Sequence, residues 1–79
     1  MNTRLAELLA EVFGLRPAEI HTELQKSEVG SWDSLKQMDL VMSLERTYDI
    51  VLEIPDILRM TSVADILAVL KDKGVTFED

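Results

Sequence analysis

Few side chains in this sequence could perform chemistry on their own. Its 79 residues include no cysteine and a single histidine, His21. A nucleophile–base pair or a zinc site needs several such side chains close together. A hydrolase and a metal site are therefore not expected, and His21 is predicted to be an exposed polar residue. Because there is no cysteine, any thiol that the protein uses has to be imported.

Among the serines, Ser34 has the position best suited to chemistry. It lies in residues 29–45, VGSWDSLKQMDLVMSLE. Asp33 is a good helix N-cap, because its carboxylate can accept hydrogen bonds from the free N–H groups of the first turn. Ser34 then occupies the first helical position, where the helix dipole and the unpaired N–H groups favour a phosphate. Serine is also common at helix starts, so its position alone favours a structural role.

The helix after Asp33, expected to run to about Tyr48, has apolar residues on two sides. The longer stripe consists of Leu40, Val41, Leu44 and Tyr48. The shorter stripe, on roughly the opposite side, consists of Leu35, Met38 and Met42. A small bundle rarely buries both faces of one helix, so the longer stripe is predicted to face the core. The shorter stripe is either a docking surface, which methionine suits, or a second packing face, for example against the third helix.

Charged residues of both signs surround the shorter stripe. They are Lys36, Asp39, Glu45, Arg46 and Asp49. A charged rim around an apolar strip is compatible with docking of a partner protein. The mixture of signs argues against docking that is purely electrostatic.

Three further helices are expected to hold this one in place. Residues 3–13 form an amphipathic helix, with Thr3 as its cap and Gly14 as its stop. Residues 14–32 are predicted to be an ordered connection with one turn at Pro17. The apolar anchors of this connection are Leu15, Ile20, Leu24 and Val29.

The last two helices are short or end near the C-terminus. Pro55 is expected to open a short helix that extends through Met60. Thr61 and Ser62 are expected to cap a final helix that ends before Gly74, and the tail from about residue 74 is expected to be loosely ordered. The buried residues of the final helix are predicted to be Val63, Ile66, Leu67 and Leu70. The fold class is therefore all-α, a four-helix bundle with three longer helices and one short one, in a single domain of residues 1–79.

Composition limits the partners. The net charge is −7, which argues against nucleic acid and anionic membranes as partners. Acidity suits docking onto basic patches of other proteins. Taken alone, the charge favours the simpler explanation that it keeps the protein soluble. No apolar run has membrane-spanning length, and the N-terminus does not have the pattern of a signal peptide, so a cytoplasmic monomer without membrane insertion is expected.

Taken together, these features resemble the acyl carrier protein family, which includes the peptidyl carrier domains. The matching residues are DSL at 33–35, LVMSLERTYDI at 40–50 and IPDILRMTSVADIL at 54–67. The DSL tripeptide alone is weak evidence for the family. The order of the helices and the short, acidic chain extend the resemblance over nearly the whole sequence.

The resemblance implies that Ser34 carries 4′-phosphopantetheine, with Asp33 as its helix cap. The imported thiol would hold an acyl or aminoacyl group as a thioester, so the chain would be a carrier and not an enzyme. Its implied partners are a phosphopantetheinyl transferase and the acyl-loading, synthase and acyltransferase enzymes of a pathway. The implied docking residues are Leu35, Lys36, Met38, Asp39, Met42, Glu45 and Arg46.

Three residues depart from the fatty-acid carriers of that family. Lys36 and Arg46 stand at positions that are often acidic or neutral, and Trp32 replaces a small residue. WDSL is similar to specialised free-standing carriers, which favours lipid, cell-envelope or secondary-metabolite synthesis over bulk fatty-acid synthesis. Trp32 either closes the core under the loop, the favoured interpretation, or lies by the prosthetic group. The alternative function is an unmodified interaction module that uses the stripe of Leu35, Met38 and Met42.

Overall fold

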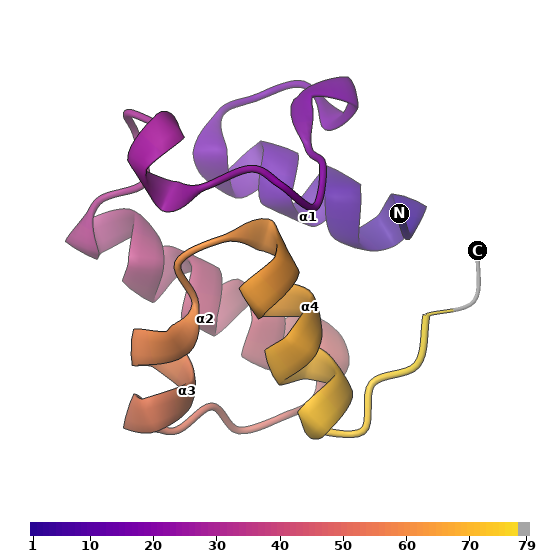
Figure 1. Cartoon of the computed structure of the whole chain (residues 1–79). Helices are drawn as coiled ribbons and strands as arrows, with labels where there is room; N and C mark the ends of the chain where they lie inside the picture. Colours follow the sequence, from indigo (N-terminus) through magenta and orange to yellow (C-terminus); the bar gives the residue numbers. More distant parts are fainter. Residues whose placement is uncertain (78–79) are drawn as a thin grey trace.

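Four α-helices and two single 3-10 turns make up the computed structural model, which describes residues 1–77 (Figure 1). The helices are α1 (Thr3–Phe13), α2 (Ser34–Tyr48), α3 (Ile54–Arg59) and α4 (Val63–Asp72). The 3-10 turns are η1 (Pro17–Glu19) and η2 (Lys26–Glu28), and both lie in the connection between α1 and α2. The predicted all-α class, with three longer helices and one short helix, is confirmed.

The ends of α1 follow ordinary capping chemistry, with one difference from the prediction. Asn2, and not Thr3, is the N-cap, since its side-chain oxygen accepts a hydrogen bond from the N–H of Leu5 at 3.0 Å. Thr3 is already the first helical residue. At the other end Gly14 has φ +69°, a left-handed conformation that glycine adopts without steric cost, so the predicted stop is confirmed.

The connection between α1 and α2 is ordered, as predicted, because it is tied to the start of α4. The N–H of Lys26 donates to the carbonyl of Thr61 at 2.9 Å, and the N–H of Val63 donates to the carbonyl of Leu24 at 3.0 Å. Apolar side chains anchor the same segment. Those that are buried are Ile20, Leu24, Val29 and Trp32. The connection therefore passes over the bundle as a fixed layer and delivers the chain to the start of α2 in a defined position.

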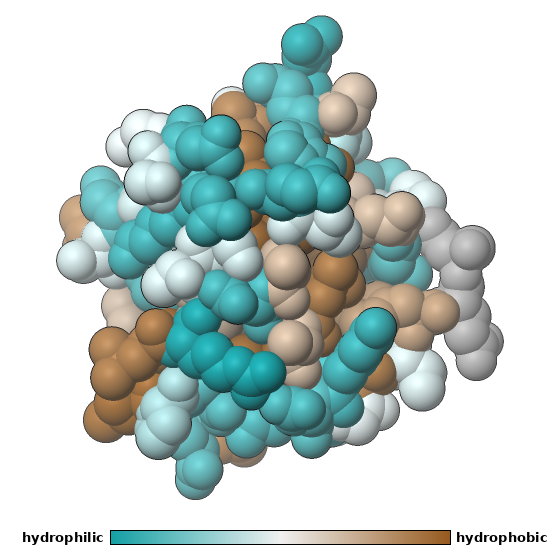
Figure 2. All heavy atoms as spheres, viewed as in Figure 1, coloured by the Kyte–Doolittle hydropathy of each residue, from teal (hydrophilic) through white to brown (hydrophobic). Residues whose placement is uncertain are grey.

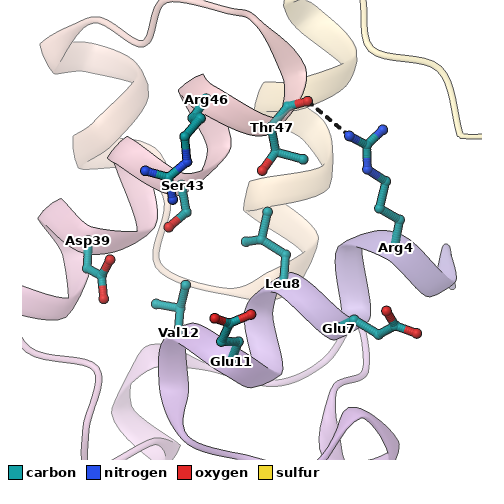
Figure 3. A pocket seen from close by; sticks show the side chains of 9 residues that line it. All are labelled: Arg4, Glu7, Leu8, Glu11, Val12, Asp39, Ser43, Arg46 and Thr47. Carbon is teal, nitrogen blue, oxygen red and sulfur yellow. Dashed lines mark hydrogen bonds between the residues drawn. The ribbon is translucent and has the colours of Figure 1, made fainter.

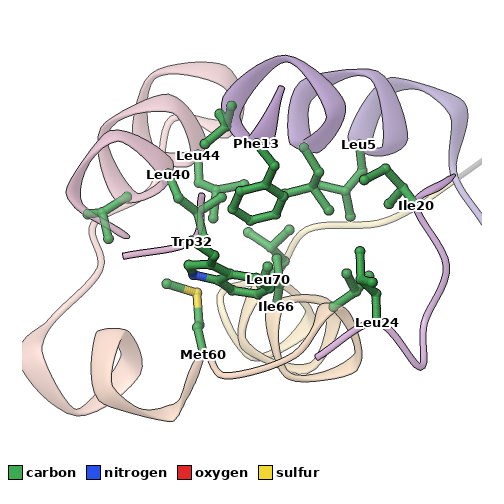
Figure 4. Packing of buried hydrophobic residues seen from close by; sticks show 14 of the residues in the cluster. Leu5, Phe13, Ile20, Leu24, Trp32, Leu40, Leu44, Met60, Ile66 and Leu70 are labelled. Carbon is green, nitrogen blue, oxygen red and sulfur yellow. The ribbon is translucent and has the colours of Figure 1, made fainter. Parts of the chain in front are cut away.

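One cluster of apolar side chains forms the core between the helices (Figure 4). Its largest fully buried members are Leu5, Leu9, Leu40, Leu44, Met60, Ile66 and Leu70. The predicted core stripe of α2 is confirmed: Leu40 and Leu44 are inaccessible to solvent, while Tyr48 is half-buried at its end. In α4 the stripe includes Val69, which the periodicity did not single out, whereas Leu67 is only half-buried.

Residues 74–77 differ from the expected loose tail. Val75 and Phe77 pack against the core, and the Phe77 ring meets the Tyr48 ring edge-on with 6.3 Å between centroids. The N–H of Val75 also donates to the carbonyl of Leu70 at 3.0 Å, which directs the chain back toward the bundle. The prediction for this segment was therefore wrong, because apolar residues after a helix end can still cover the core. The remainder of the predicted tail, residues 78–79, lies outside the described residues.

Two ion pairs join α3 to α4 along their exposed sides. Lys73 Nζ lies 2.8 Å from a carboxylate oxygen of Asp56, and the Arg59 guanidinium lies 2.7 Å from Asp72. The hydrogen bond from Lys73 is the main cause that holds the pKa of Asp56 below its ordinary value. Such pairs are individually weak at the surface, but two of them restrict the position of a helix that has only six residues.

Acid sensitivity at the start of α4 is a first testable consequence. The Asp65 carboxylate accepts hydrogen bonds from the Thr61 hydroxyl at 2.9 Å and the Thr61 N–H at 3.2 Å. The hydroxyl bond is the main reason why the pKa of Asp65 is below its ordinary value of 3.8. The pKa of Asp65 is lower in the folded state than in the unfolded state. The contribution of this carboxylate to folding stability is therefore present above about pH 4 and is lost as the pH falls through the folded-state pKa. Thermal midpoints measured between neutral pH and this acid range should show the fall, and Asp65→Asn should make it shallower. An identical acid dependence in Asp65→Asn would contradict this assignment.

Candidate functional site

Ser34 is held at the first position of α2 by the cap before it. The carboxylate of Asp33 accepts a hydrogen bond from the N–H of Lys36 at 2.9 Å, which confirms the predicted N-cap. The carbonyl of Asp33 accepts from the N–H of Gln37 at 2.8 Å. Ser34 itself is exposed. A hydroxyl at this position is accessible to a modifying enzyme, and the positive end of the 15-residue helix favours a phosphate there.

The residues just before the cap anchor it to the core. Trp32 is only 4% exposed, and its ring stacks on that of Phe13 with 4.4 Å between centroids. The hydroxyl of Ser31 donates to the carbonyl of Phe13 at 2.8 Å. Of the two interpretations of Trp32, closure of the core beneath the loop is therefore confirmed. The consequence for the site is that Ser34 is presented from a rigid start of α2.

Ser34 opens onto a cleft between α2 and α3 with a volume of about 300 Å³. Its lining residues are Lys26, Ser34, Gln37, Met38, Ile57, Leu58, Met60 and Thr61. Lys26 lines the same cleft as Ser34, so its positive charge adds to the favourable potential that the helix start offers a phosphate on the serine. The exposed hydroxyl, the helix N-terminus and this lysine together fit a phosphodiester-linked group.

Gln37 is a member of this site that the sequence reasoning missed. It is 8% exposed and it bonds to Trp32 and to α3 through its side-chain amide. A signal for it was present, because Gln37 lies three, four and seven residues before Leu40, Val41 and Leu44 and so falls on the buried stripe. A polar residue on a core stripe indicates a buried hydrogen-bond network.

The opposite side of α2 is open to solvent. Leu35, Met38 and Met42 are 83%, 51% and 59% exposed, and together they are called here the exposed face of α2. The prediction that this helix has one core face and one largely exposed apolar face is confirmed. The alternative, in which the third helix covers these three side chains, is wrong, because all three are more than half exposed. Figure 1 shows where α3 lies relative to α2.

Charged residues border the exposed face of α2 on both sides. Asp39 and Arg46 line a groove of about 500 Å³ between α1 and α2 (Figure 3), and Lys36 Nζ lies 3.9 Å from an Asp39 oxygen. On the other side, Glu45 accepts a hydrogen bond from the N–H of Leu52 at 2.9 Å. Glu45 therefore holds the connection between α2 and α3, a role that its place in the sequence did not indicate.

An apolar extension of this surface was also missed. Val51, Ile54 and Leu58 are each more than 70% exposed, in the connection after α2 and in α3. Hydrophobic side chains gather at the lower left of Figure 2, where Figure 1 shows α3. In the sequence these residues were obscured by Pro55 and by the shortness of α3, which leave too few turns to separate a buried face from an exposed one.

Other kinds of site find no support in the part of the chain that the structure describes. His21 is exposed and lies 3.3 Å from a carboxylate oxygen of Glu23, as expected for a surface residue. Residues 1–77 contain no group of three or more acidic or histidine side chains placed to hold a metal ion. Within the same residues, no helix has the length and apolar character needed to cross a membrane.

Comparison with known proteins shows the family of this chain. The phosphopantetheine attachment site family matches residues 3–70. An acyl carrier protein of Exiguobacterium sp. strain AT1b is 37% identical over 68 residues, which cover 85% of each chain. The solution structure of the holo acyl carrier protein from Geobacter metallireducens has a TM-score of 0.78 and 26% identity, and the match covers 89% of this chain and 80% of that one. The chain therefore belongs to the acyl carrier protein family, whose members are carriers of covalently attached phosphopantetheine and not enzymes.

Proposed function

We propose that Ser34 is the attachment site of 4′-phosphopantetheine and that the chain delivers an acyl or aminoacyl group to the enzymes of a pathway. The observation that carries this proposal is the exposed hydroxyl of Ser34 at the first position of α2, on the cleft that Lys26 also lines. When bound, the group supplies the thiol that the chain itself lacks. Asp33 fixes the start of the helix, and Trp32 anchors the segment, so the arm begins from a fixed point.

Intact mass after co-expression with a broad-specificity phosphopantetheinyl transferase tests this function. The carrier function predicts nearly complete conversion to a species heavier by one phosphopantetheinyl group. The alternative function, an unmodified interaction module, predicts that the mass stays that of the bare chain. Persistence of the unmodified mass under conditions that convert a known carrier would contradict the proposal.

The exposed face of α2 is the proposed docking surface for these enzymes. Leu35, Met38 and Met42 extend along one side of α2 from the residue after Ser34, so a partner seated on them would have the prosthetic arm at its edge. Lys36 and Asp39 form its charged border, with Arg46 further along the helix. We assign the transferase, loading, synthase and acyltransferase enzymes to this face. Glu45 is the least suited of the predicted docking residues, because the backbone of Leu52 already engages it.

The pathway that we propose is a specialised one, in lipid, cell-envelope or secondary-metabolite synthesis, and the carrier acts there as a cytoplasmic monomer. Support comes from the border of the exposed face of α2. Lys36 lies close enough to Asp39 to neutralise part of its charge, and Arg46 adds a positive charge near Met42. A partner enzyme that selects a strongly acidic helix would discriminate against this surface.

Met42→Glu separates docking from folding. A charge at the centre of an apolar contact surface has to be desolvated when a partner binds, whereas in the free protein the side chain is 59% exposed. The KM of the transferase for the apo carrier should rise about tenfold, which corresponds to about 1.4 kcal/mol. Ala18→Glu, at an exposed position in η1, adds the same charge away from α2 and should leave the KM unchanged. If Met42→Glu instead collapses the thermal transition, the residue belongs to the core and the assignment is wrong.

A further inference from the structure

The buried amide of Gln37 joins α2, α3 and the segment before α2. Its Nε2 donates to the carbonyl of Ile57 at 2.9 Å and to that of Met60 at 3.3 Å. Its Oε1 accepts from the indole Nε1 of Trp32 at 2.6 Å. Both ends of the side-chain amide are therefore hydrogen-bonded, and the residue is only 8% exposed. A satisfied buried network of this kind fixes one arrangement of the elements that it joins.

This amide closes the inner end of the cleft beside Ser34. Gln37 and Met60 line the cleft, and Met60 is inaccessible to solvent. Trp32 lies in the same buried cluster as Met60, and its ring stacks on that of Phe13 (Figure 4). Met38 and Leu58 also line the cleft, and they are 51% and 74% exposed.

Entry of a long aliphatic chain into the bundle would require the amide of Gln37 to move away. The indole N–H of Trp32 would then lose its hydrogen-bond acceptor inside the core. The carbonyl of Met60 would lose the hydrogen bond that it accepts from Gln37. Leaving a buried polar group without a partner costs more free energy than a typical hydrogen bond contributes to stability. The close packing of Trp32 on Phe13 would also be disturbed. These losses oppose the gain from burying methylene groups.

We propose that Gln37 determines cargo class in this carrier, because it closes the cleft between α2 and α3 and keeps the cargo outside the bundle. The cargo that suits such a carrier is a short or polar acyl group, which has little to gain from burial. A long aliphatic cargo would remain exposed to water. This inference rests on the proposed function, since it takes Ser34 to be the point at which the cargo is tethered.

The test compares two acylated forms of the wild-type protein. Acetyl and decanoyl forms are prepared by a transferase from the corresponding coenzyme A thioesters, and their thermal midpoints and nitrogen-15 NMR spectra are recorded. The chain has one tryptophan, so its indole N–H gives a single signal that reports on the bond to Gln37. The two midpoints should agree within about 1 °C, and the indole signal should have the same chemical shift in both forms. A decanoyl form with a clearly higher midpoint or a displaced indole signal would overturn the inference.

Variants that lack the hydrogen bonds of Gln37 test whether this residue keeps the acyl chain outside the bundle. The double variant Trp32→Phe, Gln37→Leu replaces donor and acceptor together by apolar groups, which avoids an unpaired indole. Its decanoyl form should melt about 5 °C above its acetyl form, because the chain can now enter the interior. Gln37→Met keeps the side-chain length but leaves the indole N–H unpaired, so both of its acyl forms should be less stable than those of the wild type. The difference between its two midpoints should have the same direction as in the double variant. Equal midpoints of the two acyl forms in these variants would overturn the role of Gln37.

Failure of the proposed function gives a different result. If no acylated form appears on Ser34 by mass, the attachment site is wrong and the inference fails with it. If both forms load on Ser34 and the decanoyl form of the wild type is stabilised, the attachment site stands and only the closed cleft is wrong.

Discussion

Replacing Ser34 by alanine is expected to abolish loading of the chain by a phosphopantetheinyl transferase. The hydroxyl oxygen is the only atom at this exposed helix start that could form the phosphodiester, and alanine removes it without disturbing the cap, which is the carboxylate of Asp33. The expected result is complete loss of the mass increment. The free energy of unfolding should change by no more than about 0.5 kcal/mol, as for other surface substitutions.

Ser27→Ala is the matched control for that experiment. Ser27 lies in η2, is exposed and precedes Ser34 by seven residues, so the same atom is removed close by. This variant should load like the wild type. A mass increment that survives Ser34→Ala would contradict the proposed site, and a strongly destabilised Ser34→Ala would show that the serine has a structural role instead.

Leu44→Ala is expected to have the largest effect on stability. Leu44 is inaccessible to solvent at the centre of the core stripe of α2, so truncation leaves a cavity between this helix and its neighbours. The cost should be about 2–5 kcal/mol. For a domain of this size the thermal midpoint should fall by at least about 10 °C, as measured by circular dichroism or calorimetry.

Met42→Ala tests whether the two faces of α2 differ as described. It lies on the same helix, two residues away, but is 59% exposed, so its truncation should change the free energy of unfolding by about 0.5 kcal/mol or less. Equal losses of stability in Leu44→Ala and Met42→Ala would contradict the assignment of one buried and one exposed face.

Periodicity predicted the helices and the orientation of α2 correctly, because both depend on local residue order. The stripe of Leu40, Val41 and Leu44 repeats at helical spacing, and burial follows from that spacing once a single core exists. Asp33 also acts within one turn of its own position, as a cap. Features that depend on neighbours in sequence could therefore be predicted from the sequence alone.

Features that depend on contacts between distant segments could not be predicted from the sequence. Glu45 was placed on the docking surface, but its carboxylate bonds the backbone of Leu52, seven residues away. Gln37 was passed over as a polar helix residue, although it bonds carbonyls of α3 twenty or more residues later. Phe77 was assigned to a loose tail and instead packs on Tyr48. Each outcome was decided by how separate segments meet, which spacing along one helix does not reveal.

The most direct measurement of the central claim is the location of the prosthetic group on the loaded wild-type protein. Trypsin should cut after Lys26 and Lys36 and release residues 27–36, SEVGSWDSLK, which contain Ser27, Ser31 and Ser34. Fragmentation of this peptide by mass spectrometry distinguishes the three serines. The group should be found on Ser34, and Ser27 and Ser31 should be unmodified. A group on either of those two serines, or a peptide that carries none while the whole protein is loaded, would contradict the account.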